Sequence, residues 1–364
     1  MRVALVHDYL NQRGGAERVF ARIADAFPTA PIYTSLYDAR ALGDLIDPAR
    51  VHTTFLQRFP FHNRYFRALA PLYPRAFEAL DLSAYDLVVS STTAWAKGVI
   101  TRPDAVHVCY INTVSRFVFD YERYVGGFGL ATFARPLVSR LVAWDKLAAQ
   151  RPTHYIANSR NVAARVAQYY GRDASVLACP VEVDRYTVGA GRGDYFVVVS
   201  RLLPYKRVDR AILACAQAGV PLHVIGTGPA EAALRELAVG TDTTFHGYID
   251  DARVNELVGN ARAAILPAEE DFGLVPLEAA AAGRPTIAYA AGGALETIVD
   301  GVTGTLFDEP TVESLAHAIV EFDPARFDAR TLRAHAQTFA PPRFIARLRQ
   351  IVEEVVERGR QPIA

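Results

Sequence analysis

The sequence has few cysteines and no excess of either charge. Its three cysteines, Cys109, Cys179 and Cys215, are odd in number and are not spaced like zinc ligands. We therefore expect reduced core residues in a cytosolic protein, not a disulfide framework. Lysine plus arginine and aspartate plus glutamate each total 39. The chain thus lacks the basic excess of most nucleic-acid-binding proteins, and we expect no nucleic-acid partner.

Several site motifs and long apolar runs are also missing. The nine histidines form neither H-x-x-x-H nor H-E-x-x-H, so we expect no catalytic metal and no bound cofactor. The G-x-G-x-x-G dinucleotide fingerprint is absent after the first predicted strand. The apolar start of the chain is interrupted by His7 and Asp8, which leaves it too short for a signal peptide or a membrane span. These absences favour a soluble cytoplasmic protein, or one associated only peripherally with the inner membrane surface.

Short β-branched runs alternate with helical patterns along the chain, which is typical of βαβ units with parallel sheets. A chain of 364 residues exceeds the usual size of one hydrophobic core, so we expect two domains. The alternation restarts after a polar, glycine-containing stretch at 182–194. We therefore predict an α/β fold with two doubly wound domains, 1–181 and 190–340. A last helix at about 342–358 could return to the first domain.

The predicted elements follow from the apolar patterns. The strands are 2–6, 32–35, 87–90, 106–111, 155–157 and 175–178 in the first domain, and 195–199, 221–225, 243–245, 263–266, 286–288 and 305–307 in the second. The helices are 15–27, 63–79, 129–150 and 159–170 in the first, and 206–218, 229–238, 250–259, 274–282 and 293–298 in the second.

The first loop of interest joins the first strand to the first helix. Gly14 and Gly15 stand at the start of that helix, where backbone N–H groups can approach a polar or anionic ligand without interference from a Cβ atom. A plain tight turn explains the same pair of glycines about equally well.

The second loop follows the first strand of the second domain. Arg201 and Lys206 lie five residues apart after that strand, and they could converge on a diphosphate, the arginine as a fork and the lysine as a point charge. The alternative is a pair of solvated surface cations. Ligands bind at the carboxyl ends of strands in doubly wound domains, which favours the binding site.

The third motif runs from Glu269 to Pro285. Gly273, Leu274 and Val275 would open a helix whose free N–H groups and dipole suit a phosphate. If the whole stretch were helical, Glu270 and Glu278 would lie roughly 12 Å apart, which exceeds the separation of a glycosidase carboxylate pair. We interpret the two glutamates as separate binders of hydroxyl groups.

A further segment mixes arginines with aromatic residues. In 56–69, Arg58, Arg64 and Arg67 stand among Phe59, Phe61, Tyr65 and Phe66. Arginine among aromatics suits an anionic membrane surface or a lipid-diphosphate acceptor. An ordinary surface helix explains the pattern nearly as well.

In combination, these motifs resemble the retaining glycosyltransferases of family 4, which have the GT-B fold. The resemblance covers nearly the whole chain and is strongest for the bacterial mannosyltransferases of O-antigen and exopolysaccharide synthesis. It is carried by Glu270-x7-Glu278 with Arg201 and Lys206 upstream, Val6-His7-Asp8-Tyr9 with Gly14-Gly15-Ala16-Glu17, Tyr155-Ile156-Ala157-Asn158-Ser159, and Phe245-His246-Gly247-Tyr248.

The resemblance implies two facing Rossmann-like domains with an interdomain cleft, and a role for each matching residue. Arg201 and Lys206 would hold the donor diphosphate, and Glu270 would meet sugar hydroxyls. Glu278 would hold the ribose. The backbone around Phe272, Gly273, Leu274 and Val275 would contact the phosphate and the sugar. Tyr248 and Ile249 would lie near the base. Gly14 and Gly15 would lie beside the acceptor and the diphosphate. The implied partners are a nucleotide-sugar donor and a glycan or lipid-diphosphate-linked acceptor.

One position departs from this pattern. Asn112 stands where the related mannosyltransferases usually carry a histidine that touches the transferred sugar, and asparagine cannot carry a charge near neutral pH. Mannose from GDP-mannose therefore remains the leading donor, with a deoxy sugar as an alternative. The rival functions are a sugar-nucleotide epimerase of the same architecture, which needs no acceptor, and a catalytically silent nucleotide-sugar-binding partner, which would bind the donor without turnover.

Overall fold

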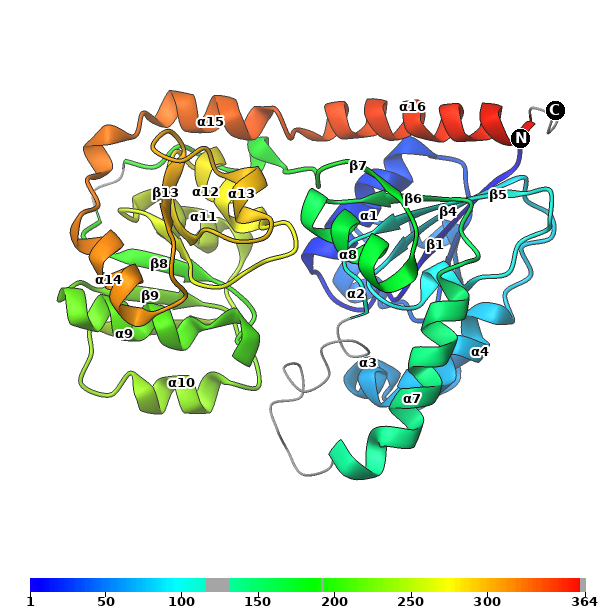
Figure 1. The fold of residues 1–364 in the computed structure, drawn as a ribbon, viewed down its shortest axis with the longest axis horizontal. Helices are drawn as coiled ribbons and strands as arrows, with labels where there is room; N and C mark the ends of the chain where they lie inside the picture. The colour runs from blue at the N-terminus through cyan, green and yellow to red at the C-terminus, as the bar shows by residue number, and fades with distance from the viewer. Residues whose placement is uncertain (116–130, 191–192, 361–364) are drawn as a thin grey trace. The chain divides into compact units, whose positions relative to one another are not determined.

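A computed structural model of the chain describes residues 1–115, 131–190 and 193–360. Its backbone contacts divide the chain into two compact units (Figure 1). Unit 1 comprises Met1–Pro180 together with Pro342–Ala364, and unit 2 comprises Val181–Pro341. None of the described helices is both long enough and apolar enough to cross a membrane.

Unit 1 is built on a parallel sheet whose order is β3-β2-β1-β4-β5-β6-β7. Its strands are β1 (Val3–His7), β2 (Ile32–Thr34), β3 (Val51–Thr53), β4 (Leu87–Thr92), β5 (Val106–Ile111), β6 (His154–Ala157) and β7 (Ala174–Val176). The edge strand β3 was not predicted. It is three residues long with His52 and Thr53 exposed, so it lacks the apolar run on which the prediction depended.

The helices of unit 1 include several short 3₁₀ segments, labelled η. The helical elements are α1 (Gly15–Ala26), α2 (Ala39–Leu42), η1 (Pro48–Arg50), η2 (Phe55–Arg58), α3 (His62–Tyr65), η3 (Phe66–Leu72), α4 (Tyr73–Glu78), η4 (Ala96–Gly98), α7 (Ala131–Ala148), α8 (Arg160–Tyr170) and α16 (Pro341–Arg360). The prediction of one helix over 63–79 was wrong, because Pro71 and Pro74 lack the N–H that a continuous helix needs. Residues 129 and 130 of the predicted helix 129–150 lie outside the described residues.

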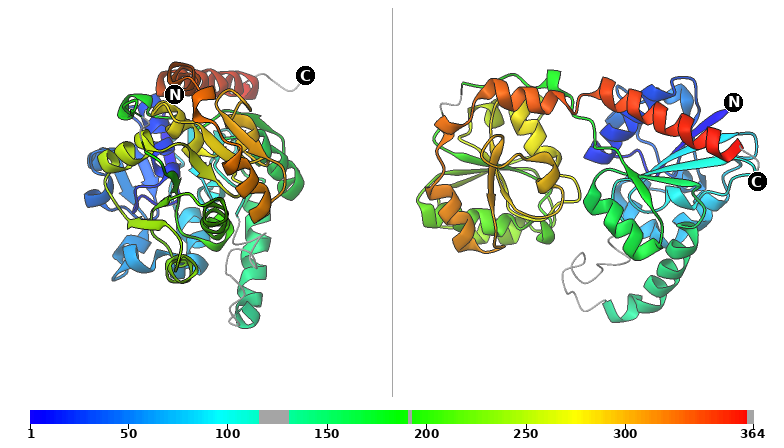
Figure 2. Two further views of the ribbon diagram at one scale, coloured as in Figure 1. Left: turned by 90° about the vertical axis from the view of Figure 1, so that its left-hand side faces the viewer. Right: turned by 45° about the horizontal axis from the view of Figure 1, so that its top comes forward.

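Alternate residues of the unit 1 strands face opposite sides of the sheet. Cys109 and Ile111 pack in one cluster with Val162 of α8, whereas Tyr110 lies between them in sequence and contacts Phe344 of α16. Arg349 of α16, the red helix of Figures 1 and 2, also donates to the carbonyl of Ala26 at the end of α1. The last helix therefore belongs to the core of unit 1.

The three cysteines are buried and free of disulfides, as predicted. Burial raises the pKa of each thiol to about 12. Since the thiolate is the reactive form, these cysteines are unreactive near neutral pH.

Unit 2 has a parallel sheet of order β10-β9-β8-β11-β12-β13. Its strands are β8 (Phe196–Val199), β9 (Leu222–Ile225), β10 (Thr243–Gly247), β11 (Ala264–Leu266), β12 (Thr286–Tyr289) and β13 (Gly304–Phe307). Its helical elements are η5 (Val183–Arg185), η6 (Pro204–Lys206), α9 (Val208–Ala218), α10 (Glu231–Leu237), α11 (Asp251–Asn260), α12 (Leu274–Ala281), α13 (Ala294–Thr297), α14 (Val312–Val320), η7 (Pro324–Arg326) and α15 (Ala329–Gln337).

The core of unit 2 lies between its sheet and helices α9, α10 and α14. Phe196 and Val198 of β8 pack there with Ile212 of α9 and Ile319 of α14. Helices α11 and α12 lie on the other side of the sheet (Figure 1). Each sheet thus carries helices on both faces, which is the doubly wound arrangement that the sequence predicts.

Candidate functional site

The predicted ligand-binding residues of unit 2 lie where the strand order reverses. From β8 the chain adds β9 and β10 on one side of the sheet and β11 to β13 on the other. The loops that follow the adjacent strands β8 and β11 therefore lead away in opposite directions along the sheet. Doubly wound domains bind ligands between two such loops. Arg201 and Lys206 follow β8, and Glu270 follows β11.

An ion pair joins these two loops. The ammonium of Lys206 contacts Oε1 of Glu270, and the two side chains are only 19% and 15% exposed. The ring of Tyr205 lies 5.2 Å from the same ammonium. The fold thus brings together two residues that are 64 positions apart in the sequence, and it places a cation and a carboxylate side by side at the carboxyl edge of the sheet.

Arg201 supplies a second cation at this edge. Its side chain is exposed, and among the described residues none accepts a hydrogen bond from its guanidinium. The backbone of its loop is fixed, because Leu202 N donates to Thr227 O at 3.0 Å and Ala230 N donates to Leu202 O at 3.0 Å. A rigid backbone with an exposed arginine fork is suited to an anionic ligand.

The loop after β11 leads directly into the N-terminus of α12. Gly273 caps this helix in the left-handed conformation, with φ of 84°, which a residue with a Cβ adopts with strain. The N–H groups of Leu274 and Val275 have no partner inside the helix, and Pro276 has no N–H to leave unpaired. The predicted phosphate-binding amides therefore stand at a real helix start. Glu270 precedes this helix, so it and Glu278 do not share one.

The remaining predicted residues of unit 2 are spread along the same edge of the sheet. Glu278 lies in the second turn of α12 and is half-buried. Tyr248 follows β10 and is 81% exposed, with half-buried Ile249 beside it. Strands β10 and β11 are three positions apart, which corresponds to roughly 14 Å. An extended ligand lying along this edge could reach Tyr248, the two cations and Glu270 in turn.

Two features of this edge were missed from the sequence. Gly293 follows β12, and a Cβ there would collide with the backbone of Phe272; its N–H donates to Glu270 O at 2.8 Å. The buried Arg210 of α9 donates to Pro267 O, and burial lowers its pKa. Both residues hold the loop that carries Glu270. Two sequence features could have identified them. Gly293 is part of a Gly-Gly pair after a predicted strand, and Arg210 is a lone arginine among the apolar positions of a predicted helix.

In unit 1, the carboxylate of Asp8 organises the corresponding edge of the sheet. Asp8 follows β1, is 1% exposed and accepts six hydrogen bonds of 2.6–2.9 Å, four of them from consecutive backbone N–H groups. These donors belong to Thr92, Thr93, Ala94, Trp95 and Ala96. Asp8 therefore holds the loop after β4, a role that the sequence pattern around it did not indicate.

The glycine pair of unit 1 lies close to a carboxylate. Gly14 caps α1, and a Cβ on it would meet Oε2 of the buried Glu17. A carboxylate beside a helix start is stabilised by the helix dipole and repels a second anion. His7, at the end of β1, stacks on Phe20 of α1, and burial lowers its pKa to about 4, so its imidazole is neutral near neutral pH. The glycine pair therefore stands at a helix start that already has a carboxylate beside it.

Asn112 stands at the carboxyl end of β5. Its side-chain nitrogen Nδ2 donates to Ser91 Oγ at 3.1 Å and to Thr92 O at 3.3 Å, and its backbone carbonyl accepts from Asn158 Nδ2 at 2.9 Å. The side chain is 9% exposed. Part of the hydrogen-bonding capacity of Asn112 is therefore used by the fold itself.

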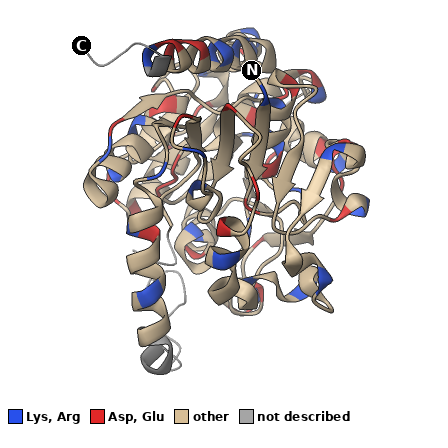
Figure 3. Cartoon of the chain, turned by 90° about the vertical axis from the view of Figure 1, so that its right-hand side faces the viewer, with Lys and Arg blue, Asp and Glu red and all other residues tan. Residues whose placement is uncertain are grey.

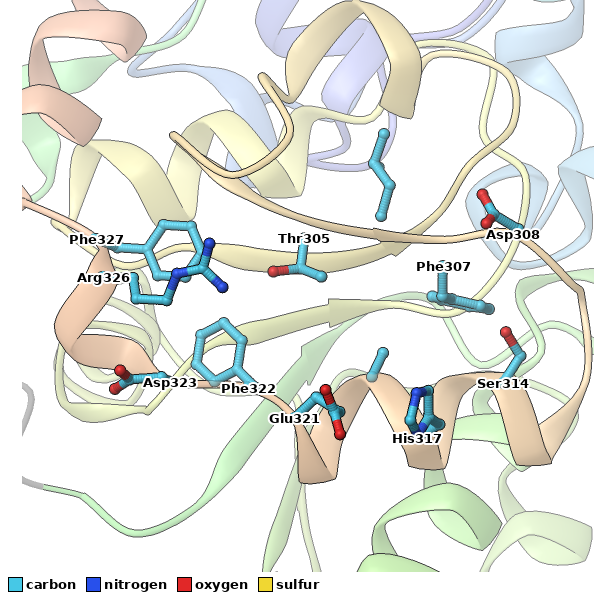
Figure 4. A pocket seen from close by; sticks show the side chains of 12 residues that line it. Thr305, Phe307, Asp308, Ser314, His317, Glu321, Phe322, Asp323, Arg326 and Phe327 are labelled. Carbon is cyan, nitrogen blue, oxygen red and sulfur yellow. The ribbon is translucent and has the colours of Figure 1, made fainter.

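A hollow of about 330 Å³ lies elsewhere in unit 2, between β13 and α14 (Figure 4). Thr305, Phe307, His317 and Arg326 are among its lining residues. None of the predicted ligand-binding residues lines it, so it is separate from the site at the end of β8 and β11.

Two family models match consecutive parts of the chain. Residues 13–185 match the model described as Glycosyltransferase Family 4, and residues 188–323 match the model described as Glycosyl transferases group 1. Together they cover parts of both units.

Curated relatives match part of the chain. A glycogen synthase of Pseudomonas aeruginosa is 36% identical over 149 residues, which are 38% of this chain and 28% of that protein. A GDP-mannose-dependent alpha-(1-6)-phosphatidylinositol monomannoside mannosyltransferase of Mycolicibacterium smegmatis is 32% identical over 202 residues, 46% of this chain and 53% of that protein. The chain thus spans between about a quarter and about half of the length of these two relatives.

Solved structures match nearly the whole fold. HepE of Anabaena, determined with UDP and glucose, aligns with a TM-score of 0.70 at 20% identity and covers 97% of this chain and 100% of that one. Sucrose-phosphate synthase of Thermosynechococcus elongatus aligns with a TM-score of 0.74 at 18% identity, covering 98% and 100%. The likeness shows that the two parallel-sheet units have the GT-B fold.

Proposed function

Because the chain belongs to glycosyltransferase family 4, we propose that it moves a hexose from a nucleotide sugar to a glycan or lipid-linked acceptor in cell-surface polysaccharide synthesis, with retention of the anomeric configuration. The observation that carries this proposal is the convergence at the switch point of unit 2. There the Lys206–Glu270 pair, the exposed Arg201 and the N-terminus of α12 offer positive charge for a diphosphate beside a carboxylate for sugar hydroxyls.

Mannose from GDP-mannose is the donor that we propose first. Its support is the resemblance to mannosyltransferases and the similarity to a GDP-mannose-dependent relative. HepE, which has the same fold, was determined with UDP and glucose, so a uridine nucleotide is the second choice. Tyr248 and Ile249 would meet the base, and Glu278 would meet the ribose.

The proposed chemistry breaks the bond between the anomeric carbon and the diphosphate oxygen and forms a bond from that carbon to the acceptor oxygen on the same face of the sugar. The electron pair of the broken bond leaves with the diphosphate, which Arg201, Lys206 and the first-turn amides of α12 stabilise. The proton of the acceptor hydroxyl passes to the leaving phosphate oxygen, so no separate general base is needed, and the direct attack of the acceptor oxygen needs no carboxylate nucleophile. Glu270 orients the sugar through its hydroxyls.

We also propose that transfer needs no metal ion. The two cationic side chains and the helix N-terminus supply the positive charge that a divalent cation provides in other phosphate-transfer sites. Transfer that persists in the presence of a chelator would support this part of the proposal.

The experiment that tests the function combines binding with transfer. Thermal unfolding is measured with GDP-mannose, UDP-glucose and a dTDP-sugar, because a ligand that binds only the folded state raises the melting temperature. The donor that binds is then incubated with glycan and lipid-linked acceptors. Transfer supports the proposal; an epimerised nucleotide sugar formed without acceptor, or binding without turnover across the acceptor panel, contradicts it.

Arg201→Ala should weaken the binding of the free nucleoside diphosphate by about 1.5–3 kcal/mol, because the hydrogen bonds that it removes are charge-assisted. Isothermal titration calorimetry measures the effect. Arg235→Ala is the matched control, since Arg235 is also exposed but pairs with Glu231 on α10. This variant should bind the nucleoside diphosphate with the same affinity as the native protein. An unchanged affinity in Arg201→Ala would remove this residue from the site.

If the chain carries Asn112 because its native donor lacks a hydroxyl group that mannose has, then Asn112→His should shift donor preference toward GDP-mannose. A site built to bond a hydroxyl discriminates against a sugar without it, because the protein group is left unpaired. The ratio of kcat/KM for GDP-mannose and the preferred donor should change by about tenfold or more. If native protein already transfers mannose and the variant has the same ratio, the idea of a changed donor fails.

A further inference from the structure

A long stretch of unit 1 carries positive charge and no acidic residue. Residues 48–77 contain no aspartate or glutamate and five arginines. The acidic residues at the two ends of this stretch are already engaged: Asp47 caps η1, and Glu78 accepts hydrogen bonds from Trp144 and Arg151 at 2.8 and 2.6 Å. The electrostatic field over α3 and η3 therefore suits an anionic partner.

The same stretch exposes large aromatic side chains. Phe61 is 75% exposed and Tyr65 is 54% exposed, and Phe59 is also exposed. In a monomeric protein, apolar side chains that gather in one place on the surface mark an interaction site more often than single ones do. We call Phe59, Phe61, Arg64, Tyr65 and Arg67 the aromatic-arginine surface.

The exposed rings stand on a framework that is firmly packed. Phe66 and Tyr73 are buried beneath them, and Tyr73 donates to Phe66 O at 2.9 Å. Asn63 donates to Asp38, which caps α2, at 3.0 Å. The guanidinium of Arg67 lies 4.4 Å from the ring of Phe66, and that of Arg64 lies 5.4 Å from the ring of Tyr65. The surface is therefore preorganised, with cations held beside aromatic rings.

Phe61 has a backbone conformation that a phenylalanine rarely adopts. Its φ of 52° and ψ of 27° lie in the left-handed region, which costs a bulky residue free energy. The strain holds an exposed phenylalanine at the start of α3, where asparagine or glycine would fit with less strain. The described residues of unit 1 leave Phe61 75% exposed, so they gain little burial from this ring, which points to a partner beyond them.

We propose that the aromatic-arginine surface docks unit 1 on an anionic phospholipid bilayer. Phe59, Phe61 and Tyr65 would enter the headgroup and upper acyl region, where aromatic rings are favoured. Arg64 and Arg67 would bind the lipid phosphates. The complementary charge and the apolar rings together fit a bilayer surface, whereas charge alone would also fit a soluble anion. Docking through this surface does not depend on the identity of the sugar donor.

Cosedimentation of the full chain with vesicles tests the proposal. The protein should bind vesicles of equal parts phosphatidylglycerol and phosphatidylcholine, bind pure phosphatidylcholine much more weakly, and dissociate as salt concentration rises. Failure to bind the anionic vesicles, or equal binding to both compositions, overturns the proposal.

Paired charge reversals locate the surface. Arg64→Glu/Arg67→Glu should reduce affinity for the anionic vesicles by at least about 25-fold, because each arginine near the lipid phosphates strengthens binding by about fivefold. The control is Arg343→Glu/Arg347→Glu, which makes the same change in net charge on the exposed face of α16, a helix in which basic and acidic residues are interleaved (Figure 3). The control should bind like the native chain, and equal reductions in the two variants would contradict the assignment.

Phe61→Asn separates docking from folding. Asparagine tolerates the left-handed conformation, so the melting temperature should stay the same or rise. Removal of the ring should reduce vesicle affinity by about tenfold. A stable Phe61→Asn protein that binds anionic vesicles as tightly as the native chain would show that this ring does not enter the bilayer.

Discussion

Lys206→Met should lower kcat/KM for sugar transfer by about 10²–10³-fold, the usual effect of removing one preorganised group that stabilises developing charge. In the native protein the Lys206 ammonium contacts Glu270, so the substitution has two consequences. The leaving diphosphate loses a cation, and the carboxylate of Glu270 loses its contact with the lysine beside an incoming anion. Steady-state kinetics and calorimetry with the nucleoside diphosphate measure the two effects.

The double variant Lys206→Met/Glu270→Gln distinguishes these consequences. Compared with Lys206→Met alone, it should recover part of the donor affinity, because the repulsion between Glu270 and the diphosphate is removed. It should not recover the turnover. Arg207→Met is the matched control, since this neighbouring cation is exposed and pairs with Asp209 at 2.9 Å. If Lys206→Met and Arg207→Met have the same kinetic constants as the native protein, Lys206 does not stabilise the leaving group.

Lys97→Met should destabilise unit 1 by about 3–5 kcal/mol, the usual result of removing one partner of a buried ion pair. Lys97 Nζ lies 2.5 Å from Oδ1 of Asp145, and both side chains are 1% exposed. Asp145 also accepts from Ser115 at 2.7 Å and Tyr170 at 2.8 Å. Without the lysine, a charged carboxylate would remain buried with only neutral donors, which is strongly unfavourable.

Tryptophan fluorescence during urea unfolding measures this effect selectively. The chain has two tryptophans, Trp95 and Trp144, and both lie in unit 1, so the signal does not depend on unit 2. The double variant Lys97→Met/Asp145→Leu should recover much of the lost stability, because apolar replacement of both partners removes the unpaired charge. A midpoint unchanged by Lys97→Met alone would mean that the pair contributes little to the stability of unit 1.

The sequence predicted the elements of unit 2 closely because its strands are buried on both faces and read as continuous apolar runs. Phe196–Val199 is an example, since its residues are apolar and form the centre of the sheet. The prediction failed where apolar patterning is weak or interrupted. The exposed edge strand β3 was missed, and the segment 63–79 was read as one helix although its prolines divide it.

For the site, the sequence by itself determined which residues follow which strand. Parallel strands end at one edge of their sheet, so Arg201, Lys206 and Glu270 had to emerge on the same side of unit 2. The Lys206–Glu270 contact was decided by tertiary structure, because the two residues are 64 positions apart and meet only where β8 and β11 are neighbours in the sheet.

Tertiary structure alone also decided the roles of Asp8, Arg210 and Lys97. In the sequence, a charged residue among apolar ones has the same appearance in two cases. It can bind a ligand, or it can satisfy buried backbone groups. Burial against hydrogen-bonding partners distinguishes the two, and partners such as Thr93, Pro267 and Asp145 are distant in the chain. Strand order and side-chain burial are properties of the folded chain, because they arise from long-range packing that local sequence patterns do not encode.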